Sequence, residues 1–175
     1  MNELLAKAKN IRCLICDVDG VLTDGSLYID NFGNELKKFN VQDGMGLKLL
    51  MAAGIEVAII TTSQNAVIDH RMKQLGISHY FKGQVDKCAA FDELKNRLNL
   101  PNEKIAYIGD DLPDLAIIRQ VGLGVAVANA VSQVKEFAFW RTEQSGGNGA
   151  VRELCELILN AQNLQDQALA RYLSS

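Results

Sequence analysis

The chain has 175 residues, 48% of them apolar, and a formal net charge of −3 at pH 7. This length and composition predict a single domain, residues 1–175, with a substantial core. Lysine and arginine are dispersed along the chain, which argues against a nucleic-acid partner. The first ten residues lack the apolar stretch of a signal peptide, and no run has membrane-spanning length, so we expect a cytoplasmic protein.

The four cysteines, at positions 13, 16, 88 and 155, are too sparse for a disulfide scaffold. Cys13 and Cys16 form a C-x-x-C pair, a spacing also found in redox and zinc sites. Residues three apart on a strand face opposite sides, however, so the two sulfur atoms would diverge. We interpret both as buried strand residues.

Residues 11–16 form an apolar run that predicts the first strand, and Asp17 and Asp19 follow it directly. Strand side chains alternate, so both carboxylates point the same way at the carboxyl edge, where open α/β sheets bind ligands. Two such carboxylates repel unless a cation lies between them, which favours Mg²⁺, and a carboxylate can form an aspartyl-phosphate. A solvated acidic turn is the alternative.

Residues 26–41 contain two extended runs around Asn31-Phe32-Gly33-Asn34, which predicts a β-hairpin projecting from the sheet. The apolar residues of its arms are Leu27, Ile29, Leu36, Phe39 and Val41. An isolated hairpin is marginally stable, so these residues need a partner surface. Copies of the chain in a homo-oligomer would supply one, and packing against its own domain is the alternative.

Apolar runs alternate with helical patterns along the rest of the chain. We predict further strands at residues 56–60, 105–108 and 124–127, and helices at 45–53, 66–75, 87–99, 112–121 and 150–163. Gly54 and Gly76 have the positions of helix C-caps. The fold class is therefore α/β, a Rossmann-like doubly wound parallel sheet with a projecting β-hairpin.

The second predicted strand ends in Thr61, Thr62 and Ser63, whose hydroxyls could hold phosphate oxygens beside the N–H groups of a helix start. A plain helix N-cap is equally compatible with them. Lys87 begins the next predicted helix, where a cation opposes the helix dipole. Either a bound phosphate or a nearby carboxylate would compensate it.

The third predicted strand is followed by Asp110, Asp111 and Asp114, again at a carboxyl edge. If this strand neighbours the first, Asp110 can complete the metal site. Asp111 and Asp114 could then orient ligands or waters around the metal. The alternative for Asp111 is a helix N-cap.

These motifs, in this order over residues 11–162, resemble the haloacid dehalogenase superfamily of aspartate-nucleophile phosphatases. The resemblance implies that Asp17 is the nucleophile and Asp19 the general acid and base. It also implies that Thr61 binds phosphate, that Lys87 clamps it, and that Asp110 binds Mg²⁺ with Asp17 and the Asp19 backbone carbonyl. The intervals between the motifs leave no room for a cap domain, so neighbouring subunits would have to cover the site.

The chain more closely resembles the 3-deoxy-manno-octulosonate 8-phosphate phosphatases, through residues 43–46, 106–111 and 146–153. The resemblance implies a magnesium-dependent phosphatase of a sugar acid phosphate in lipopolysaccharide biosynthesis, and a homotetramer joined through hairpins. Members of this group close the adjacent subunit's site with their C-terminal segment. Residues 159–162 resemble the place where their last helix ends.

Three positions depart from that pattern, because Gln42, Ser63 and Asn148 stand where these phosphatases usually carry basic residues. Arg71 and Arg152 remain, with Ser63, as candidate substrate residues. Relatives that act on nine-carbon sialic-acid-type 9-phosphates also vary at position 63, so that substrate class stays open. Two further alternatives are an inactive oligomeric scaffold and a receiver-like phospho-signalling module, although receivers have the reverse motif order.

Overall fold

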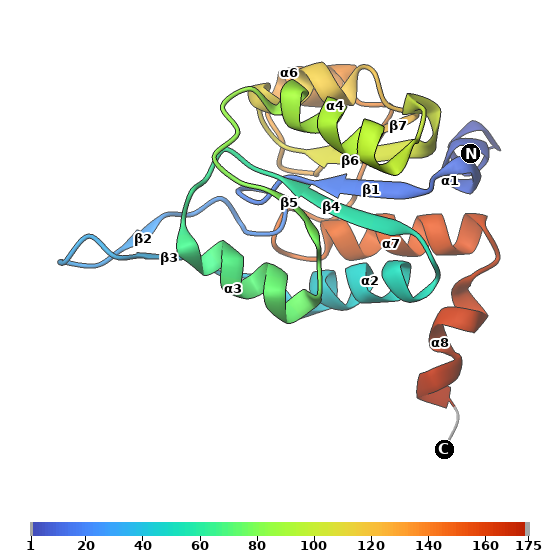
Figure 1. The fold of residues 1–175 in the computed structure, drawn as a ribbon, viewed down its shortest axis with the longest axis horizontal. Helices are drawn as coiled ribbons and strands as arrows, with labels where there is room; N and C mark the ends of the chain where they lie inside the picture. Colours follow the sequence, from blue (N-terminus) through green and yellow to red (C-terminus); the bar gives the residue numbers. More distant parts are fainter. Residues whose placement is uncertain (1, 174–175) are drawn as a thin grey trace.

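The computed structural model describes residues 2–173, which form a three-layer α/β arrangement (Figure 1). Within them one six-stranded sheet has the order β5-β4-β1-β6-β7-β8, and all neighbouring strands pair in parallel. The strands, in sheet order, are β5 (His79–Phe81), β4 (Glu56–Ile60), β1 (Cys13–Cys16), β6 (Ile105–Gly109), β7 (Leu123–Ala126) and β8 (Trp140–Arg141). The predicted Rossmann-like doubly wound sheet is confirmed.

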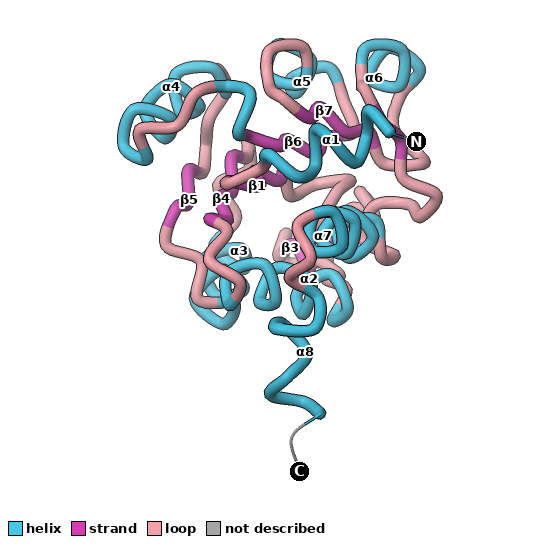
Figure 2. The backbone as a smooth tube through the Cα atoms, turned by 90° about the vertical axis from the view of Figure 1, so that its right-hand side faces the viewer, coloured by secondary structure: helices cyan, strands magenta, loops and turns pink. Residues whose placement is uncertain are grey.

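Helices cover both faces of this sheet (Figures 1 and 2). One face carries α4 (Lys87–Leu98), α5 (Leu115–Ile118) and α6 (Ser132–Phe137), and the other carries α2 (Val41–Ala52), α3 (Ala66–Leu75) and α7 (Ala150–Ala161). The remaining helical elements are α1 (Asn2–Asn10), which packs on α7, the 3-10 turns η1 (Asn102–Lys104) and η2 (Leu112–Asp114), and α8 (Gln165–Leu173). None of the helices in residues 2–173 combines the length and the apolar character that crossing a membrane requires.

The order in which strands are added reverses at β1, which lies between β4 and β6. After β1 the chain forms β4 and β5 on one side, and then crosses to build β6, β7 and β8 on the other. Cys16 pairs with Ile108, so the residues that follow the two strands lie side by side at the carboxyl edge. A reversal of strand order at this edge is where open α/β sheets bind ligands.

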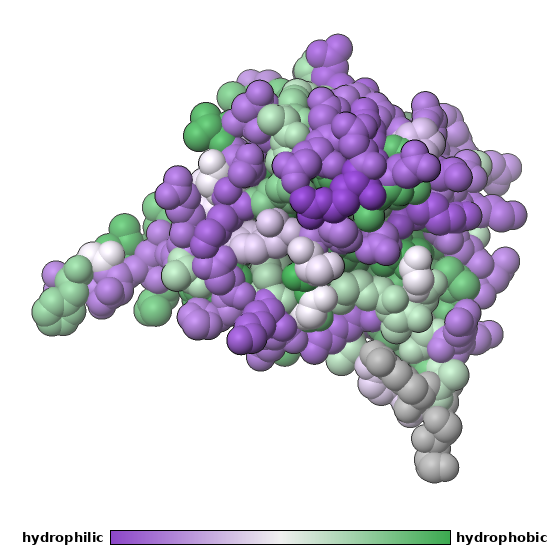
Figure 3. Space-filling model, viewed as in Figure 1, coloured by the Kyte–Doolittle hydropathy of each residue, from purple (hydrophilic) through white to green (hydrophobic). Residues whose placement is uncertain are grey.

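The predicted hairpin is present as β2 (Tyr28–Ile29) and β3 (Glu35–Leu36), an antiparallel pair that projects from the body (Figure 1). Phe32, at its tip, is 90% exposed, and hydrophobic residues are visible along the hairpin in Figure 3. Its other exposed large apolar residues are Leu27, Tyr28, Ile29 and Leu36, and Val41, the first residue of α2, is exposed as well. The alternative that these side chains pack against their own domain is therefore wrong; Phe39 does pack on the core.

Several predicted boundaries need correction. The first strand begins at Cys13 rather than at residue 11, and α2 begins at Val41 rather than 45 because the Asn40 side chain caps it by accepting the Gln42 N–H. The helix predicted at 112–121 is a 3-10 turn followed by the short α5, since Asp111 and Asp114 form a capping box that tightens the first turn.

Three α-helices and two strands are absent from the sequence prediction. Residues 159–162 do not end the last helix, because α8 follows α7 and extends away from the sheet (Figure 1). The others are α1, β5, α6 and β8. β5 and β8 lie at the two edges of the sheet and are three and two residues long, too short to show a period of their own.

The cysteine interpretation is confirmed, because all four thiols are free and Cys13 and Cys16 are buried in β1. Burial raises the pKa of the Cys13 thiol to about 12, with the nearby Glu56 charge adding to the effect. A thiol that stays protonated at neutral pH is a poor nucleophile and a poor metal ligand.

Candidate active site

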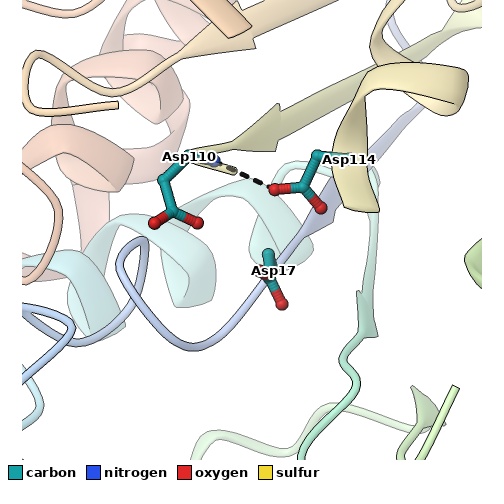
Figure 4. A group of neighbouring side chains, drawn as sticks. All are labelled: Asp17, Asp110 and Asp114. Carbon is teal, nitrogen blue, oxygen red and sulfur yellow. Dashed lines mark hydrogen bonds between the residues drawn. The ribbon is translucent and has the colours of Figure 1, made fainter. Parts of the chain in front are cut away.

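Three carboxylates converge where β1 and β6 end (Figure 4). Asp17 follows β1, Asp110 follows β6, and Asp114 closes the η2 turn. One oxygen from each lies within 4.8 Å of the others. The structure thus brings Asp17 and Asp110 together, as the adjacent strand ends predict, and it adds Asp114 to the same group.

Two glycines allow these carboxylates to approach the backbone closely. Asp114 Oδ2 accepts the N–H groups of Asp110 at 3.0 Å and Asp111 at 3.3 Å, which folds its side chain back over the end of β6. A Cβ at Gly109 would overlap the Asp114 side chain. At Gly20 a Cβ would overlap the Asp110 carboxylate, and its φ of +82° also favours glycine.

Lys87 is the buried cation of the site. It is the first residue of α4, and its side chain is 2% exposed, with Nζ 2.9 Å from Asp17 Oδ1 and 2.7 Å from Asp114 Oδ1. Burial opposes the charge on Lys87, but the two carboxylates outweigh it and raise the pKa of the ammonium. The sequence suggested either a bound phosphate or a nearby carboxylate as the partner of Lys87. The structure places the carboxylates of Asp17 and Asp114 there.

Tyr107 is a site residue that the sequence reasoning missed. Its hydroxyl is buried and donates to Asp114 Oδ1 at 2.6 Å, which fixes the carboxylate that Lys87 also contacts. Tyr107 pairs with Ile15 in the sheet, so their side chains share a face. Asp17 comes two residues after Ile15, just beyond β1, and so points to that face too. A tyrosine within an otherwise aliphatic buried strand was the available signal, because its hydroxyl needs a buried partner.

The site carries excess negative charge. Burial raises the pKa of Asp17 to about 7, with repulsion from Asp114 adding to the shift and Lys87 opposing it. Burial also raises the pKa of Asp110 to about 8, reinforced by the charges of Asp17 and Asp114. A cluster of carboxylate oxygens that binds protons this readily fits a hard divalent cation such as Mg²⁺, which would replace those protons.

Asp19 faces a different cation. Its carboxylate is 38% exposed and lies 2.5 Å from Nζ of Lys37, a lysine just beyond β3 on the hairpin. Lys37 also contacts Glu35 Oε1 at 2.6 Å, and its side chain is 3% exposed. Burial opposes the Lys37 charge, but the two carboxylates raise the pKa of the ammonium overall. Sequence reasoning missed Lys37, although alternation along an extended arm places residues 35 and 37 on one face.

Asp17, Asp19, Lys87 and Asp110 line a cavity of about 230 Å³ at the carboxyl edge. Its lining comprises Asp17, Asp19, Gly20, Gly25, Thr62, Lys87, Asp110, Asp111 and Pro113. Residues from the ends of β1, β4 and β6 therefore meet in one place, together with the first residue of α4. Asp111 also accepts the Leu112 N–H at 2.8 Å, so the N-cap considered for it is present.

The hydroxyl segment after β4 is organised largely by its own backbone. Thr61 is buried and its Oγ1 accepts the Ser63 N–H at 3.1 Å. Ser63 Oγ in turn accepts the N–H of Asn65, the residue that caps α3. Thr62 is the member of this segment that lines the cavity.

The candidate substrate residues Ser63, Arg71 and Arg152 lie outside the lining of that cavity. Arg71 donates to the Asn40 carbonyl at 3.2 Å and lines a separate hollow of about 440 Å³. Nε of Arg152 pairs with Glu156 at 2.6 Å. Within one chain, the structure does not bring these side chains to the acidic cluster.

Asp43, which bears part of the resemblance, connects two distant segments. It is 1% exposed and accepts the N–H groups of Gly149 at 3.2 Å and Arg152 at 2.8 Å, at the start of α7. The glycine-rich segment before α7 also reaches the loop after β1, because Gly147 N–H donates to the Val21 carbonyl at 2.8 Å. The Asp43 side chain thus supports the site indirectly, by holding that segment.

Comparison with known proteins identifies the family. Residues 73–154 match the haloacid dehalogenase-like hydrolase family. The 3-deoxy-D-manno-octulosonate 8-phosphate phosphatase of Yersinia pestis is 49% identical over 162 residues, covering 93% of this chain and 87% of that protein. The phosphatase of the same name from Escherichia coli K12 is 48% identical, covering 95% of this chain and 88% of its own length.

Comparison with solved structures points to the same family as the sequence relatives. A haloacid dehalogenase superfamily hydrolase of subfamily III A from Legionella pneumophila has a TM-score of 0.97 and 72% identity, covering 100% of this chain and 96% of that one. The 3-deoxy-D-manno-octulosonate 8-phosphate phosphatase of Moraxella catarrhalis has a TM-score of 0.95 and 48% identity, covering 98% of this chain and 99% of that one. That structure is a complex with magnesium, phosphate and KDO. The chain belongs to the haloacid dehalogenase-like hydrolases.

Proposed function

We propose that this protein is a magnesium-dependent phosphatase that hydrolyses 3-deoxy-D-manno-octulosonate 8-phosphate through an aspartyl-phosphate intermediate. The observation that carries the proposal is the convergence of Asp17, Asp110 and Asp114 on buried Lys87 at the carboxyl edge. Relatives 48–49% identical over most of the chain carry that activity in their names. The Moraxella catarrhalis relative was solved with a magnesium ion, a phosphate ion and a KDO molecule.

In the first step Asp17 acts as the nucleophile. Its Oδ1 accepts the Val18 N–H at 2.7 Å and contacts Lys87, which fixes the carboxylate and leaves Oδ2 to attack phosphorus in line. The Lys87 ammonium offsets negative charge on the transferring phosphoryl oxygens. Thr61 and Thr62, after β4, contribute hydroxyl or backbone donors to the same phosphoryl group.

Asp19 carries the proton in both steps. As the ester bond breaks, its protonated carboxyl gives a proton to the leaving sugar oxygen. In the second step the resulting carboxylate takes a proton from water, and that water attacks the aspartyl-phosphate, which releases phosphate and regenerates Asp17. The partial exposure of Asp19 at the cavity suits contact with both the alcohol and water.

Mg²⁺ would be held by Asp17, Asp110 and the Asp19 backbone carbonyl, with Asp111 and Asp114 orienting ligands around it. When bound, it supplies positive charge against the phosphoryl oxygens. Asp114 contributes from the protein side by fixing Lys87 and by accepting the Asp110 N–H.

Hydrolysis of a substrate panel tests the proposal. We expect magnesium-dependent phosphate release with the highest kcat/KM for the eight-carbon sugar acid phosphate. A higher kcat/KM for a nine-carbon 9-phosphate would select the alternative that the missing basic residues Gln42, Ser63 and Asn148 leave open. Preference for a neutral hexose phosphate would overturn the sugar acid assignment, and absence of release would favour a scaffold or a receiver-like module.

The Asp17→Asn variant tests the nucleophile within the same assay. An amide in place of the attacking carboxylate should lower kcat by at least ~10³-fold on every ester. The substitution removes a buried charge and leaves Lys87 paired with Asp114, so the fold should persist, as circular dichroism can check. Phosphate release at the wild-type rate would refute the assignment.

We further propose a homo-oligomer, a tetramer joined through the hairpin. It is supported by the exposed apolar side chains of Phe32, Ile29 and Leu36 on a hairpin that projects from the body. A subunit packed there would also stand near the open side of the cavity. The cytoplasmic location stays a prediction from the sequence, which cell fractionation tests.

A further inference from the structure

We propose that Lys37 is a positioning residue for the reaction: from the hairpin, it holds the Asp19 carboxylate in the orientation that proton transfer requires. The inference rests on the proposed function, in which Asp19 gives and takes the proton. Lys37 lies 18 residues from Asp19 in the sequence, and their 2.5 Å contact is made by the folded hairpin. The effect of Lys37 is thus exerted through Asp19 rather than on the substrate.

The burial of Lys37 is the first observation that carries this proposal. Its side chain is 3% exposed, whereas lysine ammonium groups normally remain in water. A buried ammonium is tolerated where carboxylates satisfy it, and Asp19 and Glu35 do so at 2.5 and 2.6 Å. The Lys37 ammonium is therefore held at a defined position, between Glu35 on the hairpin and Asp19 in the loop after β1.

The second observation is the freedom of Asp19 without that contact. Asp19 lies in the loop after β1 and is 38% exposed, so packing alone leaves its carboxylate room to rotate. Asp17, by contrast, is held by a backbone N–H and by buried Lys87. A proton donor displaced by about 1 Å from its partner can lose ~10²-fold in rate. The Lys37 contact is made to Oδ1, so it restricts this motion and leaves Oδ2 to carry the transferred proton.

The next residue, Lys38, provides a matched control on the same arm. Its side chain is 55% exposed, and its Nζ is 3.4 Å from the carboxylate of Asp24. Neighbouring residues of an extended arm face opposite sides, so the two lysines differ in orientation rather than in chemistry. An effect specific to Lys37 should be absent when Lys38 is changed.

The experiment compares wild type with four variants: Lys37→Met, Lys37→Arg, Glu35→Gln and Lys38→Met. For each protein, kcat and KM are measured with Mg²⁺ present on two substrates, an alkyl phosphate and p-nitrophenyl phosphate. For Lys37→Met we expect kcat on the alkyl ester to fall ~10- to 100-fold with KM unchanged within about twofold. Lys37→Arg should recover most of that loss, because it restores a cation to Asp19. Lys38→Met should stay within about twofold of wild type.

Leaving-group dependence separates positioning from a structural role. In single-turnover measurements of the first step, Lys37→Met should be slowed less on p-nitrophenyl phosphate, because nitrophenolate departs with little help from an acid. Equal slowing on both esters would overturn the proposal. So would a rise in KM alone, or a Glu35→Gln variant that matches Lys37→Met, because that would mean the lysine only anchors the hairpin.

The result also distinguishes this inference from the proposed function. If wild type releases phosphate with Mg²⁺ and Lys37→Met matches it, the Lys37 assignment alone fails. If wild type releases no phosphate from any ester, the proposed function fails and this inference fails with it. Circular dichroism and gel filtration of each variant show whether the fold and the assembly are retained. If Lys37→Met does not fold, Lys37→Gln, which also removes the cation, takes its place with the same expected result.

Discussion

Lys87 and Asp114 form an ion pair of 2.7 Å in which the two side chains are only 2% and 1% exposed. Asp17 shares the same ammonium at 2.9 Å, and the Tyr107 hydroxyl donates to the Asp114 oxygen that Lys87 contacts. One buried cation thus faces two carboxylates, with Asp110 close by. The charge of this site is balanced only when a second cation or protons are added. The stability of the folded protein and its affinity for Mg²⁺ should therefore both depend on Lys87 and on pH.

Replacing Lys87 with methionine should destabilise the protein by about 3 kcal/mol or more in EDTA. The substitution keeps the volume of the side chain but leaves Asp17 and Asp114 buried without their cation. Urea unfolding gives the free energy directly, and phosphate release should be lost in the same variant.

The control for this variant is Lys82→Met. Lys82 contacts Asp69 at 2.5 Å, as close a pair as that of Lys87, but both side chains are more than 40% exposed. Exposed ion pairs contribute little to stability, so the unfolding curve should match wild type. Equal destabilisation by the two substitutions would contradict the argument that burial makes the Lys87 pair matter.

Magnesium affinity should rise with pH between 6 and 9. The pKa of Asp17 is about 7 and that of Asp110 about 8, so both carboxyls hold protons in this range that a metal ion must displace. Calorimetry at pH 7 in two buffers of different ionisation enthalpy should reveal proton release on binding. Asp110→Asn should bind more weakly and release fewer protons; an affinity that is constant from pH 6 to 9 would contradict the raised pKa values.

Without metal, the folded state should lose stability as pH rises from about 4 to 8. An unfolded aspartate has a pKa of about 3.9. The folded values for Asp17 and Asp110 are about 7 and about 8, so the native state binds more protons in this window. Stability then falls with increasing pH. Melting temperatures in EDTA should show the fall, and saturating Mg²⁺ should reduce it; a melting temperature that rises over this range would refute the prediction.

The sequence predicted those parts of the site that depend on local rules. Alternation along β1 and the shared carboxyl edge of parallel strands place Asp17 beside Asp110, as the register of Cys16 with Ile108 confirms. The alternation rule also separated Cys13 from Cys16. Such rules act over a few residues and need no knowledge of the tertiary fold.

The remaining contacts depend on where distant segments meet. Asp114 joins the acidic cluster because the absence of a side chain at Gly109 leaves space for it. The sequence shows the glycine but not which side chain fills the space. Lys37 reaches Asp19 through the path of the hairpin. Asp43 accepts N–H groups more than 100 residues away, from Gly149 and Arg152. No periodic pattern encodes such pairings, since each follows from packing of the whole chain.

The exposed hairpin yields a prediction about assembly. Ile29 and Phe32 are 65% and 90% exposed, and replacing both with serine should shift the protein toward smaller species at equal concentration, because their apolar area no longer drives association. Analytical ultracentrifugation measures the shift. The matched control is Phe137→Ser, which removes an aromatic side chain 47% exposed on α6, away from the hairpin, and should leave the distribution unchanged. An unaltered distribution for the hairpin variant would refute hairpin-mediated assembly.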